Sequence, residues 1–83
     1  MERIDIIKIL KDIIKKTCPQ KGIDLDKVSE ESSLKEDLGL DSIEVIVIAL
    51  AIENEFGIEF SDYDVNTFET VGNVITYIKE KLD

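Results

Sequence analysis

The stretch DLGLDSIEVIVIAL, residues 37–50, joins an acidic turn to an apolar run and decides how the chain folds. The run VIVIALAI begins at Val45 and is rich in valine and isoleucine, which favour strands. The length of the segment, and the glycine at position 57 that follows Phe56, are instead typical of a helix. We therefore predict a helix over residues 42–56.

This helix begins with an aspartate and a serine, and a glutamate follows within the first turn. Asp41 and Glu44 have the spacing of a capping box, and such a cap stabilises a helix by about 1 kcal/mol. In that interpretation Ser42 merely fills the first turn. A serine there also lies beside free backbone N–H groups and the positive end of the helix dipole, where a phosphate ester is stabilised. Gly39 would let the preceding loop turn tightly and leave the hydroxyl open to a modifying enzyme. The residues alone leave both interpretations open.

Helical patterns also mark the two ends of the chain. Apolar residues recur at helical spacing from Ile4 to Ile14, and this helix should end near Thr17 because Pro19 disfavours a helical residue before it. Ser61 is expected to cap a short helical turn, and Thr70 a last helix. The apolar face of that last helix is formed by Val71, Val74, Ile75, Ile78 and Leu82.

The polar segment between the first helix and the motif, residues 18–37, is predicted to be a long loop. Its apolar residues would fold back on the helices: Ile23, Leu25, Val28 and Leu34. Loops of this length are uncommon in compact domains and are often functional. The prediction is an all-α fold: a four-helix bundle with a short third helix and a long first loop, in a single domain spanning residues 1–83.

Composition limits the partners and the compartment. The chain has 83 residues, a formal net charge of −9 and no histidine, which argues against nucleic acids and anionic membranes and favours partners that carry Lys and Arg. Cys18 is the only cysteine, so no internal disulfide forms and a cytoplasmic location is expected. The longest apolar run falls short of the roughly 20 residues that span a bilayer. We expect a soluble monomer without membrane insertion.

Enzymatic chemistry is not expected from these residues. Ser42 has no histidine to act as its base, and Asp41 beside it is better explained as a cap. The carboxylate pair of Asp62 and Asp64 is expected to form a solvated face rather than a metal site. No P-loop, dinucleotide fingerprint or EF-hand pattern occurs.

From Leu34 to Ile78 the sequence resembles the acyl carrier protein family. The pattern Asp-Leu-Gly-x-Asp-Ser-Ile, followed by a helix that ends in ENEF and by IEFSD, is similar to that family's phosphopantetheine attachment site and the region after it. The resemblance implies that a phosphopantetheinyl transferase moves 4′-phosphopantetheine from coenzyme A to Ser42. Asp41 would orient the site and help to position the transferase's metal. Acyl intermediates would then be carried as thioesters to enzymes of fatty acid synthesis or of a specialised lipid pathway, such as lipid A or polyketide synthesis.

The resemblance also implies that partner enzymes contact the helix after Ser42. Acidic residues of that helix, Asp41, Glu44 and Glu53, would meet basic surfaces of acyltransferases, ketosynthases or an acyl-ACP synthetase (ACP, acyl carrier protein). The chain departs from the fatty-acid type at Val47, where a glutamate is common, and at Asn54, where an acidic residue is common.

The departure at Val47 extends an apolar stripe along the helix. Ile43, Val47 and Leu50 are spaced at i, i+4 and i+7, so they share one face, which is either a docking site or part of the core. Two alternative functions remain. One is a carrier of aminoacyl or peptidyl groups, and the other is an unmodified helical adaptor that binds a basic partner through this stripe.

Three further features concern the interior. Phe60, Tyr63 and Phe68 either line an acyl-chain pocket or form plain core. Two alanines, Ala49 and Ala51, would leave room beside the helix. Cys18 has no histidine or second cysteine nearby to lower its pKa, so we expect a half-buried structural thiol.

Overall fold

The computed structural model describes all 83 residues and contains four α-helices and two short 3₁₀ turns. The helices are α1 (Arg3–Thr17), α2 (Ser42–Phe56), α3 (Asp62–Asn66) and α4 (Val71–Leu82), and the turns are η1 (Pro19–Lys21) and η2 (Leu25–Lys27). The predicted all-α architecture is confirmed, including the short third helix. Ser61 and Thr70 cap α3 and α4 with their side chains, as expected.

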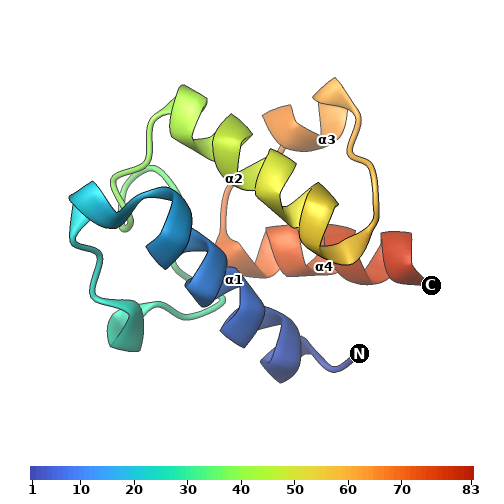
Figure 1. The fold of residues 1–83 in the computed structure, drawn as a ribbon, viewed down its shortest axis with the longest axis horizontal. Coiled ribbons are helices and arrows are strands. Elements are labelled where there is room, and N and C mark those ends of the chain that lie inside the picture. Colours follow the sequence, from blue (N-terminus) through green and yellow to red (C-terminus); the bar gives the residue numbers. More distant parts are fainter.

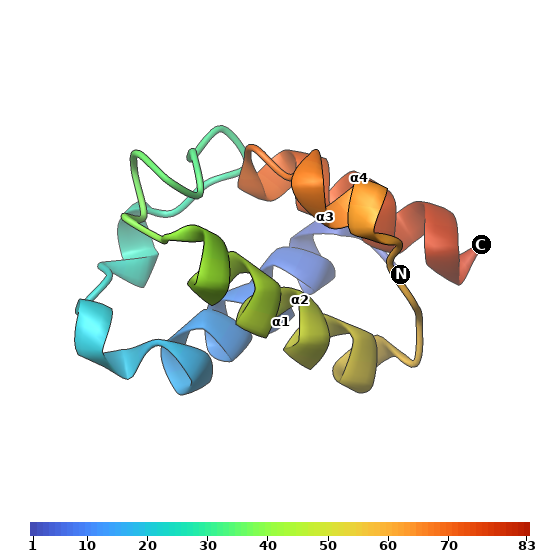
Figure 2. The same ribbon diagram turned by 90° about the horizontal axis from the view of Figure 1, so that it is seen from above.

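The helices enclose a single core (Figure 1). α1 packs against both α2 and α4, and α3 packs against α2. Both views show the two chain termini together at one end and the long first loop at the other (Figure 2). The N-terminus of α2 therefore lies at the end of the molecule opposite to the termini.

One cluster of nineteen buried apolar residues forms the core. α1 contributes Ile6, Ile7, Leu10, Ile13 and Ile14, whereas Ile4 at its first turn is exposed. The last helix buries Val71, Val74, Ile75 and Ile78, and Leu82 at its final turn is 40% exposed. Helical spacing thus identified the inward faces, and the exceptions lie at helix ends.

The first loop is more ordered than the sequence predicted. Besides η1 and η2, its backbone lies along the connection between α3 and α4: Leu34 N–H donates to the Glu69 carbonyl at 2.9 Å, and Val71 N–H donates to the Ser32 carbonyl at 3.0 Å. Val28 and Leu34 are buried as expected, while Ile23 and Leu25 are half-buried. Such pairing satisfies backbone groups that burial of the loop would otherwise leave without partners.

An arginine ties this loop to two helices. The Arg3 guanidinium donates to the Glu30 carboxylate at 2.6 Å, to the Gly72 carbonyl at 3.0 Å and to Thr76 Oγ1 at 3.1 Å. The hydrogen bond from Arg3 holds the pKa of Glu30 below its usual value. A Cβ at position 72 would lie 3.0 Å from the Glu30 carbonyl oxygen, so the close approach of loop and helix favours glycine there.

Cys18 follows α1 directly and is buried, not half-buried as predicted. Its backbone N–H donates to the Ile14 carbonyl at 2.9 Å, which continues the helical hydrogen bonding and carries the side chain into the core. None of the helices combines the length and the apolar character that crossing a bilayer requires.

Candidate functional site

The N-terminus of α2 carries the predicted capping box. Asp41 Oδ1 accepts from Glu44 N–H at 2.8 Å, and Glu44 Oε1 accepts from Asp41 N–H at 2.9 Å. Ser42 is the first residue of the helix and is exposed. Because the cap is complete without the serine hydroxyl, capping alone does not account for a serine at this position.

The segment before Ser42 is anchored to the core on both sides of Gly39. Leu38 and Leu40 are buried, and Leu40 N–H donates to the Leu34 carbonyl at 3.0 Å. Between them Gly39 is exposed and has φ +70°, a left-handed conformation that glycine adopts without steric cost. The chain therefore delivers Asp41 and Ser42 to the surface from a short, anchored turn.

A lysine from the first loop reaches this turn, and sequence reasoning missed it. Lys21 Nζ lies 2.9 Å from the Gly39 carbonyl oxygen, to which it donates, and 3.0 Å from Glu44 Oε1. No local pattern links Lys21 to the motif, because the loop that joins them has no repeating spacing.

The three acidic residues proposed to meet partners differ in availability. Asp41 is exposed and forms no salt bridge. The Glu44 side chain is only 15% exposed and pairs with Lys21. Glu53 is half-buried, and its Oε2 accepts from Phe60 N–H at 2.6 Å, which ties the end of α2 to the following loop. The carboxylates of Glu44 and Glu53, which were expected to meet partners, thus each bind another group within this domain.

The apolar stripe on α2 is exposed, so it is not core. Ile43 is 73%, Val47 42% and Leu50 59% exposed. Ile46, which the sequence reasoning did not single out, is 49% exposed beside them. We call these four residues the α2 patch. The opposite side of the helix faces the core with Val45, Ile48, Ala49 and Ile52. Since α2 is apolar on both sides, periodicity could not tell one side from the other.

A groove of about 390 Å³ runs beside the α2 patch, between α2 and α3. Ile46, Ala49 and Leu50 line its α2 side, and Phe60 and Val65 lie opposite. Ala49 thus leaves room as predicted, but this room opens to the surface rather than to the interior.

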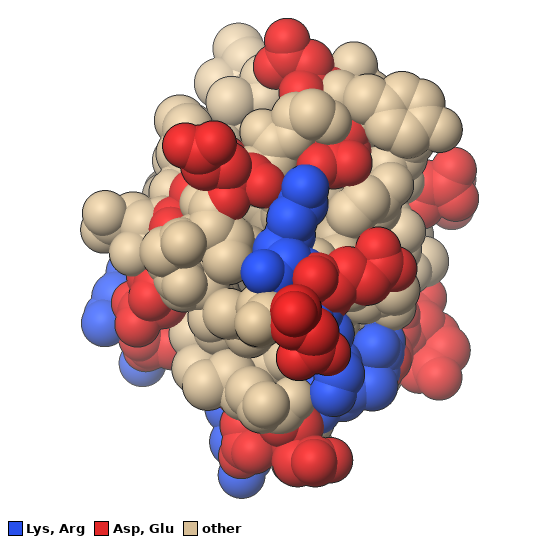
Figure 3. Space-filling view, turned by 90° about the vertical axis from the view of Figure 1, so that its right-hand side faces the viewer, with Lys and Arg blue, Asp and Glu red and all other residues tan.

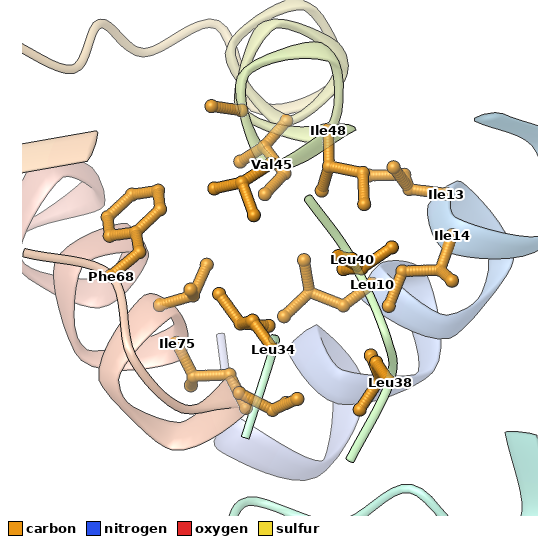
Figure 4. Packing of buried hydrophobic residues seen from close by; sticks show 14 of the residues in the cluster. Leu10, Ile13, Ile14, Leu34, Leu38, Leu40, Val45, Ile48, Phe68 and Ile75 are labelled. Atoms are coloured by element: carbon orange, nitrogen blue, oxygen red, sulfur yellow. The ribbon is translucent and has the colours of Figure 1, made fainter. Parts of the chain in front are cut away.

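A small hollow lies next to Ser42 and is partly lined by buried core residues. It measures about 80 Å³ and is lined by Ser42, Val45 and Phe68, among others. Val45 and Phe68 also line an interior cavity of about 20 Å³ whose ten lining residues are all apolar. Figure 4 shows Val45 of α2 pointing into the core above Leu34, Leu40 and Leu10, with the Phe68 ring at one side of the cluster.

The aromatic residues divide between core and surface. Phe68 is buried and meets Phe60 edge-on, with ring centroids 5.1 Å apart. Tyr63 is 73% exposed and lines neither the cavity nor the hollow, so it fits neither of the two alternatives, pocket or core. Ala51 also lies outside the cavity lining.

Acidic side chains spread over the surface. On the face shown in Figure 3, red acidic groups are more widespread than blue basic ones. The backbone N–H of Ser61 lowers the pKa of Asp64, and Lys81 at 3.4 Å adds to the effect. The structure brings together no cluster of three or more side chains suited to holding a metal ion.

Comparison with known proteins agrees with this geometry. Residues 7–78 match the family model described as the phosphopantetheine attachment site. The chain is 36% identical over 80 residues to the acyl carrier protein of Thermotoga maritima, covering 96% of this chain and 95% of that protein. The crystal structure of acyl carrier protein from T. maritima aligns with a TM-score of 0.85 at 34% identity, covering 99% of this chain and 92% of that one. An acyl carrier protein from Enterococcus faecalis aligns with a TM-score of 0.77 at 36% identity, covering 98% and 99%.

The fold and the site define a small helical carrier domain. The chain belongs to the acyl carrier protein family. Phosphopantetheine is the prosthetic group of this family, and its members are carriers that work with biosynthetic enzymes and are not themselves enzymes.

Proposed function

We propose that Ser42 is the residue that bears 4′-phosphopantetheine. The observation that carries the proposal is the exposed serine at the first position of α2, beside a capping box that does not use its hydroxyl. A phosphodiester on Ser42 Oγ lies near the free N–H groups and the positive dipole end of a fifteen-residue helix. The residues present therefore fit the group.

The chemistry of the prosthetic group is thioester formation through its terminal thiol. The protein's own part is to present Ser42 and to guide enzymes to it. Asp41, the exposed carboxylate next to the serine, attracts Lys and Arg on partners and supports the transferase's metal. Exposed ion pairs contribute about 0 to 1 kcal/mol each, so such contacts set association rate and orientation more than affinity.

Partner enzymes dock on α2 in this proposal. The α2 patch follows Ser42 along the helix and offers apolar contact area, while Glu44 and Glu53 are engaged within the domain. The partners are a phosphopantetheinyl transferase and, for acyl transfer, acyltransferases, ketosynthases or an acyl-ACP synthetase. An apolar α2 surface suits a carrier that serves a restricted set of enzymes in a specialised lipid pathway.

The cargo is an acyl chain rather than an aminoacyl group. The hollow beside Ser42 and the interior cavity share Val45 and Phe68, and the cavity lining is wholly apolar. Each CH₂ group moved from water into such an interior contributes about 0.8 kcal/mol. A charged aminoacyl group would find no polar partner there.

The modification is tested by intact mass spectrometry. The purified protein is incubated with coenzyme A, Mg²⁺ and a broad-specificity phosphopantetheinyl transferase, with Ser42→Ala as control. A mass increase of one phosphopantetheine in the wild type and none in the control supports the proposal. A wild type that circular dichroism shows to be folded but that stays unmodified would favour the alternative, an unmodified adaptor that binds partners through the α2 patch.

The choice of partners is tested at Val47. Acylation by enzymes of general fatty acid synthesis is compared between the wild type and Val47→Glu. The glutamate is expected to improve use by those enzymes, because their docking surfaces are basic. Equal and efficient use of both proteins would remove the basis for a specialised carrier.

A further inference from the structure

Lys21 connects the first loop to Gly39 and Glu44, which lie on either side of Ser42 in the sequence. It ends η1, whose position is set by α1: Lys21 N–H donates to the Cys18 carbonyl at 3.2 Å, and Cys18 is buried in the core. Pro19 begins η1, and Gly22 after it has φ +60°. The lysine backbone is therefore held by the end of α1, independently of α2.

The side chain of Lys21 spans the turn before Ser42. Its ammonium donates to the carbonyl oxygen of Gly39 at 2.9 Å, three residues before the serine. It also lies 3.0 Å from Glu44 Oε1, two residues after the serine. The same Glu44 oxygen accepts from Asp41 N–H at 2.9 Å. One ammonium group thus joins Gly39, Asp41 and Glu44 in a single polar network around Ser42.

The network has two consequences for the site. The Gly39 carbonyl lies at an exposed glycine between two buried leucines, and the Lys21 ammonium is the side-chain donor that holds its direction. The charge of Glu44 is also neutralised, so Asp41 is left as the unpaired carboxylate next to the serine. The side chains of Lys21 and Glu44 are 32% and 15% exposed, so solvent screens this pair less than the more exposed pairs of Lys16 with Asp12 and of Lys27 with Asp24.

We propose that Lys21 is a positioning residue for the modification of Ser42: it holds the turn from Gly39 to Asp41 in the conformation that the transferase binds. This inference rests on the proposed function of Ser42. Without the lysine the turn would populate other conformations. The apparent affinity of the transferase for the carrier would then fall in proportion to the fraction of molecules whose turn has the conformation that it binds. The effect is therefore a higher KM for the carrier protein with little change in kcat.

The experiment measures initial rates of phosphopantetheine transfer as a function of carrier concentration, for the wild type, Lys21→Met, Lys21→Arg and Lys27→Met. Methionine keeps most of the apolar length of the side chain and removes the charge and the donors. Lys27 is a matched control, because it lies in the same loop, is 85% exposed and pairs only with Asp24 in its own turn, at 3.9 Å. Melting temperatures and the amide NMR shifts of Gly39 and Asp41 are recorded for each protein.

We expect KM to rise about tenfold in Lys21→Met, equivalent to about 1.4 kcal/mol. Lys21→Arg should recover most of this loss, and Lys27→Met should behave as the wild type. The Gly39 and Asp41 amide shifts should move in Lys21→Met alone. Wild-type kinetics in Lys21→Met, or equal losses in both methionine variants, would overturn the inference while the wild type is still modified. A wild type that is not modified would instead overturn the proposed function of Ser42.

Discussion

The dual use of Asp41 leads to a prediction that separates helix capping from recognition. The cap requires an acceptor oxygen at this position, because Asp41 Oδ1 receives Glu44 N–H at 2.8 Å. Recognition by the transferase and its metal requires a negative charge. Asparagine retains the acceptor and removes the charge, whereas alanine removes both. The two variants therefore report on different properties of one side chain.

The magnitudes follow from the contacts. Asp41→Ala loses one of the two hydrogen bonds of the capping box, a cost of about 1 kcal/mol, and a favourable charge at the helix N-terminus, worth about 0.3 to 1 kcal/mol. A total of about 1 to 2 kcal/mol lowers the melting temperature of a domain of this size by about 4 to 16 °C. Asp41→Asn loses only the favourable interaction of the charge with the helix N-terminus, so its melting temperature should fall by about 1 to 8 °C, and by less at high salt.

The assay pairs thermal unfolding, followed by circular dichroism, with the rate of phosphopantetheine transfer to Ser42. We expect Asp41→Asn to fold almost as stably as the wild type and to lose at least tenfold in kcat/KM for the transferase. Transfer to Asp41→Asn at the wild-type rate would refute the recognition role and leave Asp41 as a helix cap. Equal destabilisation by asparagine and alanine would refute the capping estimate.

Further predictions concern the core, the loop and the cargo. Ile52→Ala, at a fully buried position, should destabilise the domain by about 2 to 5 kcal/mol in urea unfolding, whereas Ile43→Ala in the exposed α2 patch should change stability by less than about 0.5 kcal/mol. The pKa of Glu30 is lowered in the folded protein, so its contribution is present above its unfolded pKa of about 4.3 and is lost as the pH falls through the folded value. Glu30→Gln should therefore be less stable than the wild type at neutral pH, and the difference should shrink in acid; a difference that does not change with pH would contradict this. Loading with an octanoyl group should shift the methyl NMR signals of Val45 and other residues of the cavity lining, because the chain must push the helices apart to enter about 20 Å³. Unchanged interior methyl signals, with an acetyl-loaded protein as reference, would exclude an internal site for the chain.

Much of the fold follows from local sequence. α2 spans residues 42–56 as predicted, because its cap at Asp41 and its end at Gly57 depend on residues within one turn of each helix end. The end of α1 near Pro19 and the caps of α3 and α4 are local in the same sense. The proposed attachment motif around Ser42 is also contiguous, so the resemblance to acyl carrier proteins was visible without a structure.

Tertiary structure decided what surrounds that motif. α2 is apolar on both sides, so its sequence allowed either side to face the core, and only packing against α1 and α3 left the α2 patch exposed. The carboxylate of Glu44 was predicted to meet partners, but Lys21 reaches it from a distant loop. A backbone N–H at Phe60 likewise engages Glu53. The physical reason is that helix caps depend on neighbours along the chain, whereas the availability of a side chain depends on groups that only folding brings near.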